Sequence, residues 1–376
     1  MMTAAQLSDR LLRYTRERLA EPEVAASITP DTRLFEDRVI DSLKVLELIA
    51  FLQSTLGRKI PDAQIVLSNF RSIATIAQVF TGDAPIVTRH RVRRAEYRAK
   101  SSPAVSDLMA RGELRVTPSG ALVLRGSMLA LLDYFDSTVR AWASELGAIE
   151  ESYPDRISLG TLDRAGFTSA FPQKLVRLED SARPPAVCYH HYPSFAGATL
   201  DTGGSLVTAV GCCYRNEFDP RAANPAERLA EFTMREIVAV GDARFVEDLR
   251  GSLMERATHW LKELALDGFI ETASDPFFTS EESRGRMLMQ QVLPLKYELR
   301  LRVDAAGRTI AAASFNNHQQ HFGRAFSIGL ASGEQATSGC VAFGWERWII
   351  AFVSQHGPDE SSWPDPVRGR DVAATA

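Results

Sequence analysis

The sequence predicts an α+β protein in which a small helical domain precedes a larger domain of mixed helices and strands. Apolar residues recur at helical spacing through residues 1–82. From about residue 104, helical stretches alternate with short apolar runs of the kind found in buried strands. A length of 376 residues suits one large domain and a small one. We therefore predict domains at 1–82 and 104–365, a basic linker at 83–103 and a tail at 366–376.

The composition is that of an ordinary globular protein, with 45% hydrophobic and 24% charged residues. A net charge of −4 gives no sign of nucleic-acid binding by the whole chain. The longest apolar runs are too short to span a membrane, so no membrane partner is expected. Four cysteines, two of them adjacent, do not resemble a disulfide framework, and we expect a cytoplasmic protein.

The first domain contains three helices that periodicity can locate. They are predicted around residues 7–19, over 42–56 and over 72–80. The loop between the first two should turn Leu34 and Phe35 inward. Within the linker that follows, residues 86–100 carry six basic residues against one acid, which favours a solvated tether over an RNA-binding stripe.

The larger domain begins its regular structure with a predicted amphipathic helix over 129–146. An apolar run at 205–214 predicts a buried strand, and 244–265 predicts a second helix. A further strand is expected at 295–303, and 341–352 should join a strand to a helix.

Ser42 is the first candidate functional residue. Asp41 suits a helix N-cap, which places Ser42 at the helix start, where a phosphodiester would be stabilised by the helix dipole. Both residues could equally be simple capping residues. The surrounding Leu34-Phe35-Glu36-Asp37, Val39-Ile40-Asp41-Ser42-Leu43 and Asn69-Phe70, however, resemble the acyl and peptidyl carrier proteins over nearly all of residues 3–82. The resemblance implies a four-helix domain with 4′-phosphopantetheine on Ser42.

Two arginine-containing segments of the larger domain indicate nucleotide chemistry. Tyr214-Arg215-Asn216-Glu217 precedes a polar loop with Arg221 and Arg228, and a strand should resume at 232–238. Phe343-Gly344-Trp345-Glu346-Arg347 places a second arginine where a strand gives way to a helix. Each segment alone is more often a surface ion pair. As an ordered set they resemble motifs 2 and 3 of class II aminoacyl-tRNA synthetases, over roughly residues 110–360.

A narrower resemblance is to the amino acid:carrier-protein ligases, truncated seryl-type relatives that load carrier proteins. The resemblance implies an antiparallel sheet flanked by helices, and a homodimer formed through the helix at 129–146. The segments that carry the resemblance are Phe171-Pro172-Gln173, Cys188-Tyr189-His190-His191-Tyr192-Pro193, Glu231-Phe232-Thr233-Met234-Arg235-Glu236, Asp275-Pro276-Phe277-Phe278, Lys296-Tyr297-Glu298-Leu299 and Gly339-Cys340.

The same resemblance implies a zinc site of Cys188, Glu236 and Cys340, with a fourth position open for the substrate amino group. Taken from the residues alone this signal is weak, because buried free cysteines are usually core residues and Glu231 is an alternative ligand. Cys212 and Cys213 lie on the predicted buried strand, where we expect core positions.

The resemblance also assigns ATP contacts. Arg215 would bind the α-phosphate, Glu217 the adenine amino group and Arg347 the γ-phosphate, with Mg2+ accompanying ATP. Ser314-Phe315-Asn316-Asn317 resembles the segment before motif 3 of seryl-type enzymes. Class II enzymes usually keep a metal-binding glutamate just before this segment, but Ala311 stands there. The substrate pocket candidates are Glu298, Ser314 and Asn316.

These assignments predict an enzyme that activates a small amino acid with ATP and transfers it to the thiol of a carrier, in cis or in trans. A phosphopantetheinyl transferase must first modify Ser42. The alternative is a carrier fused to a decayed docking domain, which the alanine at 311 favours. A tRNA synthetase is disfavoured, because no tRNA-binding arm is recognisable.

Overall fold

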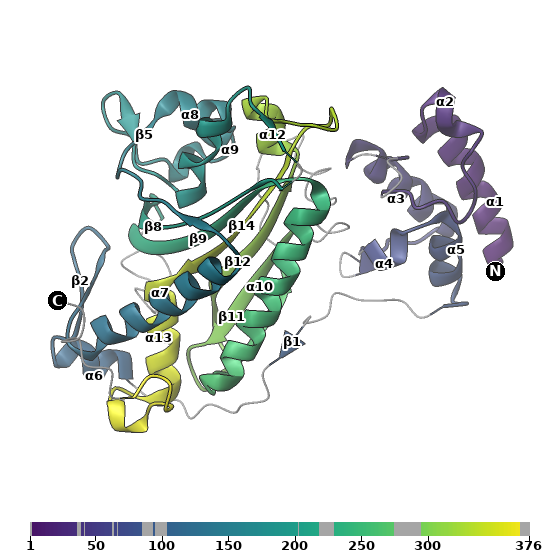
Figure 1. The fold of residues 1–376 in the computed structure, drawn as a ribbon. Coiled ribbons are helices and arrows are strands. Elements are labelled where there is room, and N and C mark those ends of the chain that lie inside the picture. Colours follow the sequence, from purple (N-terminus) through teal and green to yellow (C-terminus); the bar gives the residue numbers. More distant parts are fainter. Residues whose placement is uncertain are drawn as a thin grey trace. The chain divides into compact units, whose positions relative to one another are not determined.

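A computed structural model of the protein describes residues 2–35, 39–40, 42–61, 64–65, 67–84, 93–94, 104–201, 203–217, 229–273 and 295–368. It divides the chain into two compact units, one formed by residues 1–90 and 272–295 and one by 91–271 and 296–376 (Figure 1). The described elements of the first unit are all helices, whereas the second contains an eight-stranded sheet, which confirms the α+β class. No helix among the described residues is long and apolar enough to cross a membrane.

The first unit packs its helices around one apolar core. Thr3 starts the first helix through a capping box with Gln6. The inward positions predicted for Leu34 and Phe35 are confirmed, since both are buried. Ser42 begins a helix with the predicted bounds. The elements are α1 (Ala4–Tyr14), the π-helical turn η1 (Thr15–Leu19), α2 (Pro22–Ala25), α3 (Ser42–Leu56), α4 (Leu67–Phe70) and α5 (Ile73–Thr81).

The second unit is organised by its large sheet, in which β11, β12, β14, β9 and β8 pair antiparallel in that order. β4 adds to β8 in parallel at one edge. β1 pairs with β10 at the other edge, so part of the predicted linker belongs to the sheet. In spatial order the strands are β1 (Arg93–Arg94), β10 (Gly268–Thr272), β11 (Lys296–Arg302), β12 (Thr309–Gln319), β14 (Thr337–Gly344), β9 (Glu231–Gly241), β8 (Ser205–Tyr214) and β4 (Ile149–Glu150).

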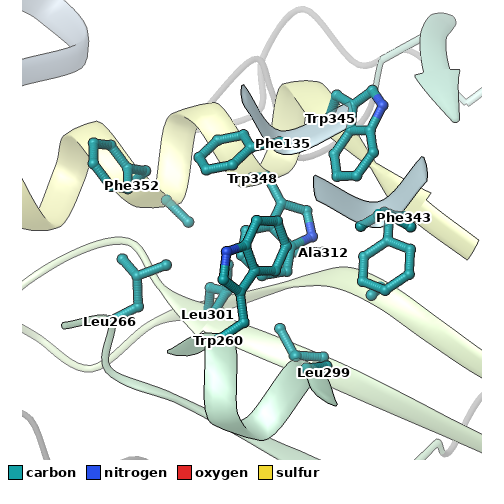
Figure 2. Packing of buried hydrophobic residues seen from close by; sticks show 14 of the residues in the cluster. Phe135, Trp260, Leu266, Leu299, Leu301, Ala312, Phe343, Trp345, Trp348 and Phe352 are labelled. Carbon is teal, nitrogen blue, oxygen red and sulfur yellow. The ribbon is translucent and has the colours of Figure 1, made fainter. Parts of the chain in front are cut away.

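Three long helices, α7 (Ser127–Glu145), α10 (Ala243–Glu263) and α13 (Trp345–His356), pack on one face of this sheet (Figure 1). Figure 2 shows Phe135, Trp260 and Trp348 gathered in one core with the strand residues Leu299 and Leu301. This aromatic core leaves the opposite face of the sheet free to carry polar groups. We call that opposite face the site face.

Shorter elements cover part of the site face and the ends of the sheet. The 3-10 helices η4 and η5 and the helix α12 pack over β8, β9 and β14 on the site face. The remaining elements are α6 (Ala104–Ala110), β2 (Leu114–Val116), β3 (Leu122–Leu124), β5 (Ile157–Ser158), α8 (Leu159–Arg164), α9 (Phe167–Ala170), η3 (Pro172–Lys174), β6 (Ser181–Ala182), η4 (Val187–His190), η5 (Tyr192–Phe195), β7 (Thr199–Leu200), α12 (His321–Phe326), β13 (Gly329–Leu330) and η7 (Glu360–Ser362).

Two sequence expectations differ from the structure. Cys212 is exposed rather than part of the core, because its side chain lies on the same face of β8 as Val210, which is also exposed. Cys213 points to the other face and is buried as expected. The large unit also continues past residue 365, since Val367 is buried and the Arg368 guanidinium donates to the carbonyl of Trp363.

A buried ion pair ties α7 to the sheet and yields a stability prediction. Arg235, almost fully buried, donates two hydrogen bonds of 2.7 and 2.6 Å to Asp136. Asp136→Ala would leave this guanidinium short of a partner and should cost about 3 kcal/mol of unfolding free energy. The control is Glu145→Ala, which removes an exposed ion pair with Arg256 and should cost less than about 1 kcal/mol. Urea unfolding followed by tryptophan fluorescence measures both, and equal losses would contradict the prediction.

Candidate functional site

Three potential metal ligands meet on the site face. Glu236 lies in β9, Cys340 in β14 and Cys188 in the 3-10 helix η4 above them. The register places Ala342 opposite Glu236 and Cys340 opposite Val238, so the two strand ligands project from the same face. The ligand atoms of all three residues lie within 4.8 Å of one another and all three residues are buried.

Hydrogen bonds fix this cluster before any ion is considered. The Glu236 carboxylate accepts from the backbone N–H groups of Val187 and Cys188, at 3.1 and 3.2 Å, and so holds η4 on the sheet. Asn316 Nδ2 donates to Cys340 Sγ at 3.3 Å. Asn316 Oδ1 is buried and has no hydrogen-bond partner among the described residues, which leaves an acceptor available beside the cluster.

The chemistry of the cluster suits a divalent cation. A hydrogen bond with Cys340, burial and the nearby Glu236 raise the pKa of the Cys188 thiol well above its ordinary value. Burial likewise raises the pKa of Glu236. Two thiolates on one tetrahedral zinc lie about 3.8 Å apart, given a Zn–S bond of about 2.3 Å. The three groups therefore have a spacing and donor set that fit zinc, and a divalent charge would favour their ionised forms.

The arginines of the two predicted motifs also come together on the site face. Arg215 follows β8, its Nε donates to the carbonyl of Pro185 at 3.0 Å, and its guanidinium lies over the Phe232 ring. Arg347 lies in the first turn of α13 and donates to the carbonyl of Ala311 at 3.0 Å. Burial and the charge of Arg215 lower the pKa of Arg347, whereas Glu217 raises it. The two guanidinium groups are thus close enough to repel each other, and a bound anion would relieve that repulsion.

The carboxylates near these arginines are already paired. Burial opposes ionisation of Glu217, but Lys174 and Arg215 hold its pKa below the ordinary value. Burial likewise opposes ionisation of Glu298, whose pKa is lowered by Lys296 and Arg300. The site therefore has two parts, an anionic cluster around Cys188 and a region rich in cations around Arg347.

The remaining predicted residues divide into placed and undescribed ones. Ser314 and Asn316 project from β12 beside this site, opposite Ala342 and Cys340. Glu231 begins β9 and is not part of the three-ligand group. Ser42 begins α3 in the first unit. Asp41, Arg221, Arg228 and the segment 275–278 lie outside the described residues.

Several site residues were not singled out from the sequence. His318, beside the cluster, brings Nε2 to 3.7 Å from Cys340 Sγ and Nδ1 to 3.3 Å from the Tyr192 hydroxyl. Burial lowers the pKa of His318 to about 3, so its ring is neutral. Glu346 accepts two hydrogen bonds from the Thr233 N–H and joins the two motifs. In the sequence, only the position of Glu346 inside the second motif indicated a role in the site. No sequence pattern indicated His318.

Comparisons with known proteins agree with this division into two units. Residues 9–80 match the family model for a phosphopantetheine attachment site. The chain is 37% identical over 190 residues to amino acid--[acyl-carrier-protein] ligase 1 of Bradyrhizobium diazoefficiens, which covers 50% of this chain and 57% of that ligase. Ligase 2 of the same organism gives 37% identity over 191 residues, 50% of this chain and 55% of that ligase. The chain thus spans little more than half the length of these relatives.

Comparison with solved structures identifies the fold. The seryl-tRNA synthetase of M. kandleri, solved with a tRNASec of A. aeolicus, superimposes with a TM-score of 0.66 at 19% identity, covering 93% of this chain and 69% of that one. The seryl-tRNA synthetase of Pyrococcus horikoshii, solved with ATP, gives a TM-score of 0.60 at 14% identity and covers 73% and 63%. The protein therefore joins an N-terminal phosphopantetheine-attachment domain to a region with the seryl-type class II synthetase fold.

Proposed function

We propose that this protein is an ATP-dependent amino acid:carrier-protein ligase that carries its own carrier domain. The observation that carries the proposal is the meeting of Cys188, Glu236 and Cys340 beside Arg215 and Arg347 on one face of a class II fold. The likeness to two amino acid--[acyl-carrier-protein] ligases and the phosphopantetheine-attachment domain support the same conclusion.

In the first step an oxygen of the amino acid carboxylate attacks the α-phosphorus of ATP, which forms an aminoacyl-adenylate and releases pyrophosphate. Arg215 would hold the α-phosphate, where negative charge builds up, and Arg347 the γ-phosphate. Glu217 would accept a hydrogen bond from the adenine amino group. Asn316 Oδ1, buried and without a hydrogen-bond partner in the described part of the chain, is available to accept from the substrate.

In the second step the thiolate of a phosphopantetheine arm attacks the activated carbonyl carbon, a thioester forms and AMP leaves. The arm would be attached to Ser42 by a phosphopantetheinyl transferase, at the N-terminal end of α3, where the helix dipole favours a phosphodiester. Loading takes place on this carrier domain or on a carrier in trans. Mg2+ would accompany ATP in the first step.

We assign Cys188, Glu236 and Cys340 as the ligands of a zinc ion. When bound, zinc supplies an open fourth position that a free amino group can occupy. The surrounding residues orient the substrate. When its amino group lies at this cluster, its carboxylate points toward the cations around Arg215. Such a site selects α-amino acids over other carboxylic acids. Cysteines outside disulfides at these positions also fit the cytoplasm, where a reducing environment keeps them available to bind zinc.

The zinc assignment predicts a specific loss of metal. Protein purified from zinc-supplemented cells should contain about one zinc per chain by elemental mass spectrometry, as expected for one three-ligand site. Cys340→Ser should lose most of it, because a hydroxyl is a poor zinc ligand. Cys212→Ser alters an exposed cysteine on the same sheet and should retain the metal. Equal zinc contents in the two variants would contradict the assignment.

The activity predicts self-loading of the carrier. After modification by a phosphopantetheinyl transferase, the protein given ATP and a panel of amino acids should gain the mass of one aminoacyl group, read by intact-protein mass spectrometry. Ser42→Ala should lose the arm and the cargo yet keep ATP–pyrophosphate exchange. Arg215→Ala should reduce exchange by about 10²–10³-fold, the cost of one electrostatic group.

The same measurements distinguish the proposed ligase from the alternative of a decayed docking domain, which the alanine at position 311 favours. A modified Ser42 without exchange for any amino acid would establish that alternative. Exchange that survives Arg215→Ala would overturn the role of that arginine. Charging of a tRNA instead of the carrier would identify a true tRNA synthetase.

We further propose a homodimer formed through α7 and the β4 edge of the sheet. Ile149 in β4 is 67% exposed and Val210 in the neighbouring strand β8 is 39% exposed, which places apolar side chains at this edge. Ile149→Asp should convert dimers to monomers in sedimentation velocity at micromolar concentrations. Val24→Asp, an equally apolar exposed site in the first unit, should leave the dimer intact. A wild-type protein that sediments as a monomer would refute this arrangement.

A further inference from the structure

A β-bulge sets which residues of β12 face the ATP region. Leu299 pairs with Ala313, but the next residue, Arg300, pairs with Ala311, so Ala312 is an extra residue in β12. Leu299 and Ala313 belong to the helix-covered core. Figure 2 shows Ala312 with Leu299 in that core. Because side chains alternate along a strand, Arg300 and Ala311 both project to the site face.

Position 311 is where the class II resemblance leads us to expect a carboxylate that helps hold magnesium. The residues around it do not fit such a site. Glu298, the carboxylate nearest along β11, has Oε1 at 2.8 Å from Lys296 Nζ and Oε2 at 3.2 Å from Arg300 Nη1. Glu217 pairs with Lys174. Glu271 Oε1 lies 3.5 Å from Arg300 Nε. All three carboxylates are therefore engaged by protein cations, and none presents a free pair of oxygens to Mg2+.

Arg300 is instead held rigidly opposite Ala311. Its Nε donates to Thr309 Oγ1 at 3.0 Å and its Nη2 to the Thr309 carbonyl at 3.1 Å, while Nη1 bonds to Glu298. Its side chain is 28% exposed, so part of the guanidinium remains accessible. A preorganised guanidinium binds phosphate with little further loss of side-chain entropy.

The local charge also favours an anion. The positive charges of Arg215 and Arg300 both lower the pKa of the buried Arg347. Lys296 adds a further positive charge on the same strand as Arg300. Two carboxylates face these cations: Glu298 lies between Lys296 and Arg300, and Glu271 Oε1 lies 3.5 Å from Arg300 Nε. The region therefore has more positive than negative side chains, which suits a polyanion better than a divalent cation.

We propose that Arg300 binds a phosphate group of ATP. Its positive charge, next to position 311, replaces the magnesium ion that a carboxylate at this position helps to hold in other class II enzymes. The inference rests on the proposed function, since it takes ATP as the ligand. It means that this chain binds the triphosphate largely through fixed cations. The smaller side chain of Ala311 leaves the space that a phosphate oxygen needs beside Arg300.

Calorimetric titration of ATP into the full-length, zinc-loaded protein tests this, in resin-treated buffer with and without Mg2+ so that no chelator removes zinc. Wild-type affinity should change less than about threefold between the two buffers. Arg300→Met should weaken ATP binding at least tenfold without Mg2+, on the scale of one charged hydrogen bond. It should leave AMP binding, which also reports an intact fold, nearly unchanged.

Two further variants sharpen the test. Ala311→Glu restores a carboxylate and should make ATP binding depend on Mg2+ at least tenfold, because the new charge repels the phosphates until a cation joins them. Arg308→Met, in the turn between β11 and β12, removes an exposed arginine paired with Asp304 and should bind ATP like the wild type.

The outcomes are distinguishable. Wild-type binding that falls tenfold without Mg2+, together with normal binding by Arg300→Met, would overturn this inference and leave the proposed function standing. Failure of ATP to bind under every condition would overturn the proposed function itself.

Discussion

The site depends on two consecutive residues of β9 that project to opposite faces of the sheet. Arg235 enters the helix-covered face and bonds to Asp136 of α7, which in turn accepts from Trp345 Nε1 at the start of α13. Glu236 enters the site face and holds η4 through two backbone N–H groups. Because a strand alternates strictly, a shift of one residue in register would exchange these roles and destroy both. The packed aromatic core therefore fixes the register on which the ligand cluster depends.

Sequence patterns located elements whose periodicity is local. The helix at 42–56 and the strand at 205–214 have the predicted bounds, because each is delimited by its own apolar pattern. β12 was not predicted as a strand, since its Ala-rich start and polar end show neither the alternation of a half-buried strand nor the repeat of a helix. Exposure of Cys212 could not be foreseen, because it depends on how far other elements cover its face of β8.

The candidate site was accessible from the sequence only through ordered motifs. Cys188, Glu236 and Cys340 are far apart along the chain, and only strand register and the placement of η4 bring them together. The resemblance to a ligase family identified these three residues as candidate zinc ligands. Their spacing alone would have assigned them to the core. Neighbours such as His318 and Arg300 belong to no motif by themselves. Their roles follow from contacts made across strands, which a single sequence does not encode in readable form.

The division of charge across the site constrains the chemistry that it can support. The proposed amino acid substrate has an amino group at one end and a carboxylate at the other, and the two ends require different surroundings in a buried pocket. The cluster at Cys188 offers anionic ligands, while the region of Arg215 and Arg347 offers cations, so the substrate has one favoured orientation. That orientation directs the carboxylate, not the amino group, at the phosphates. This polarity supports the proposed adenylation of an amino acid, whereas a fatty acid has no amino group for the open position of the proposed zinc site.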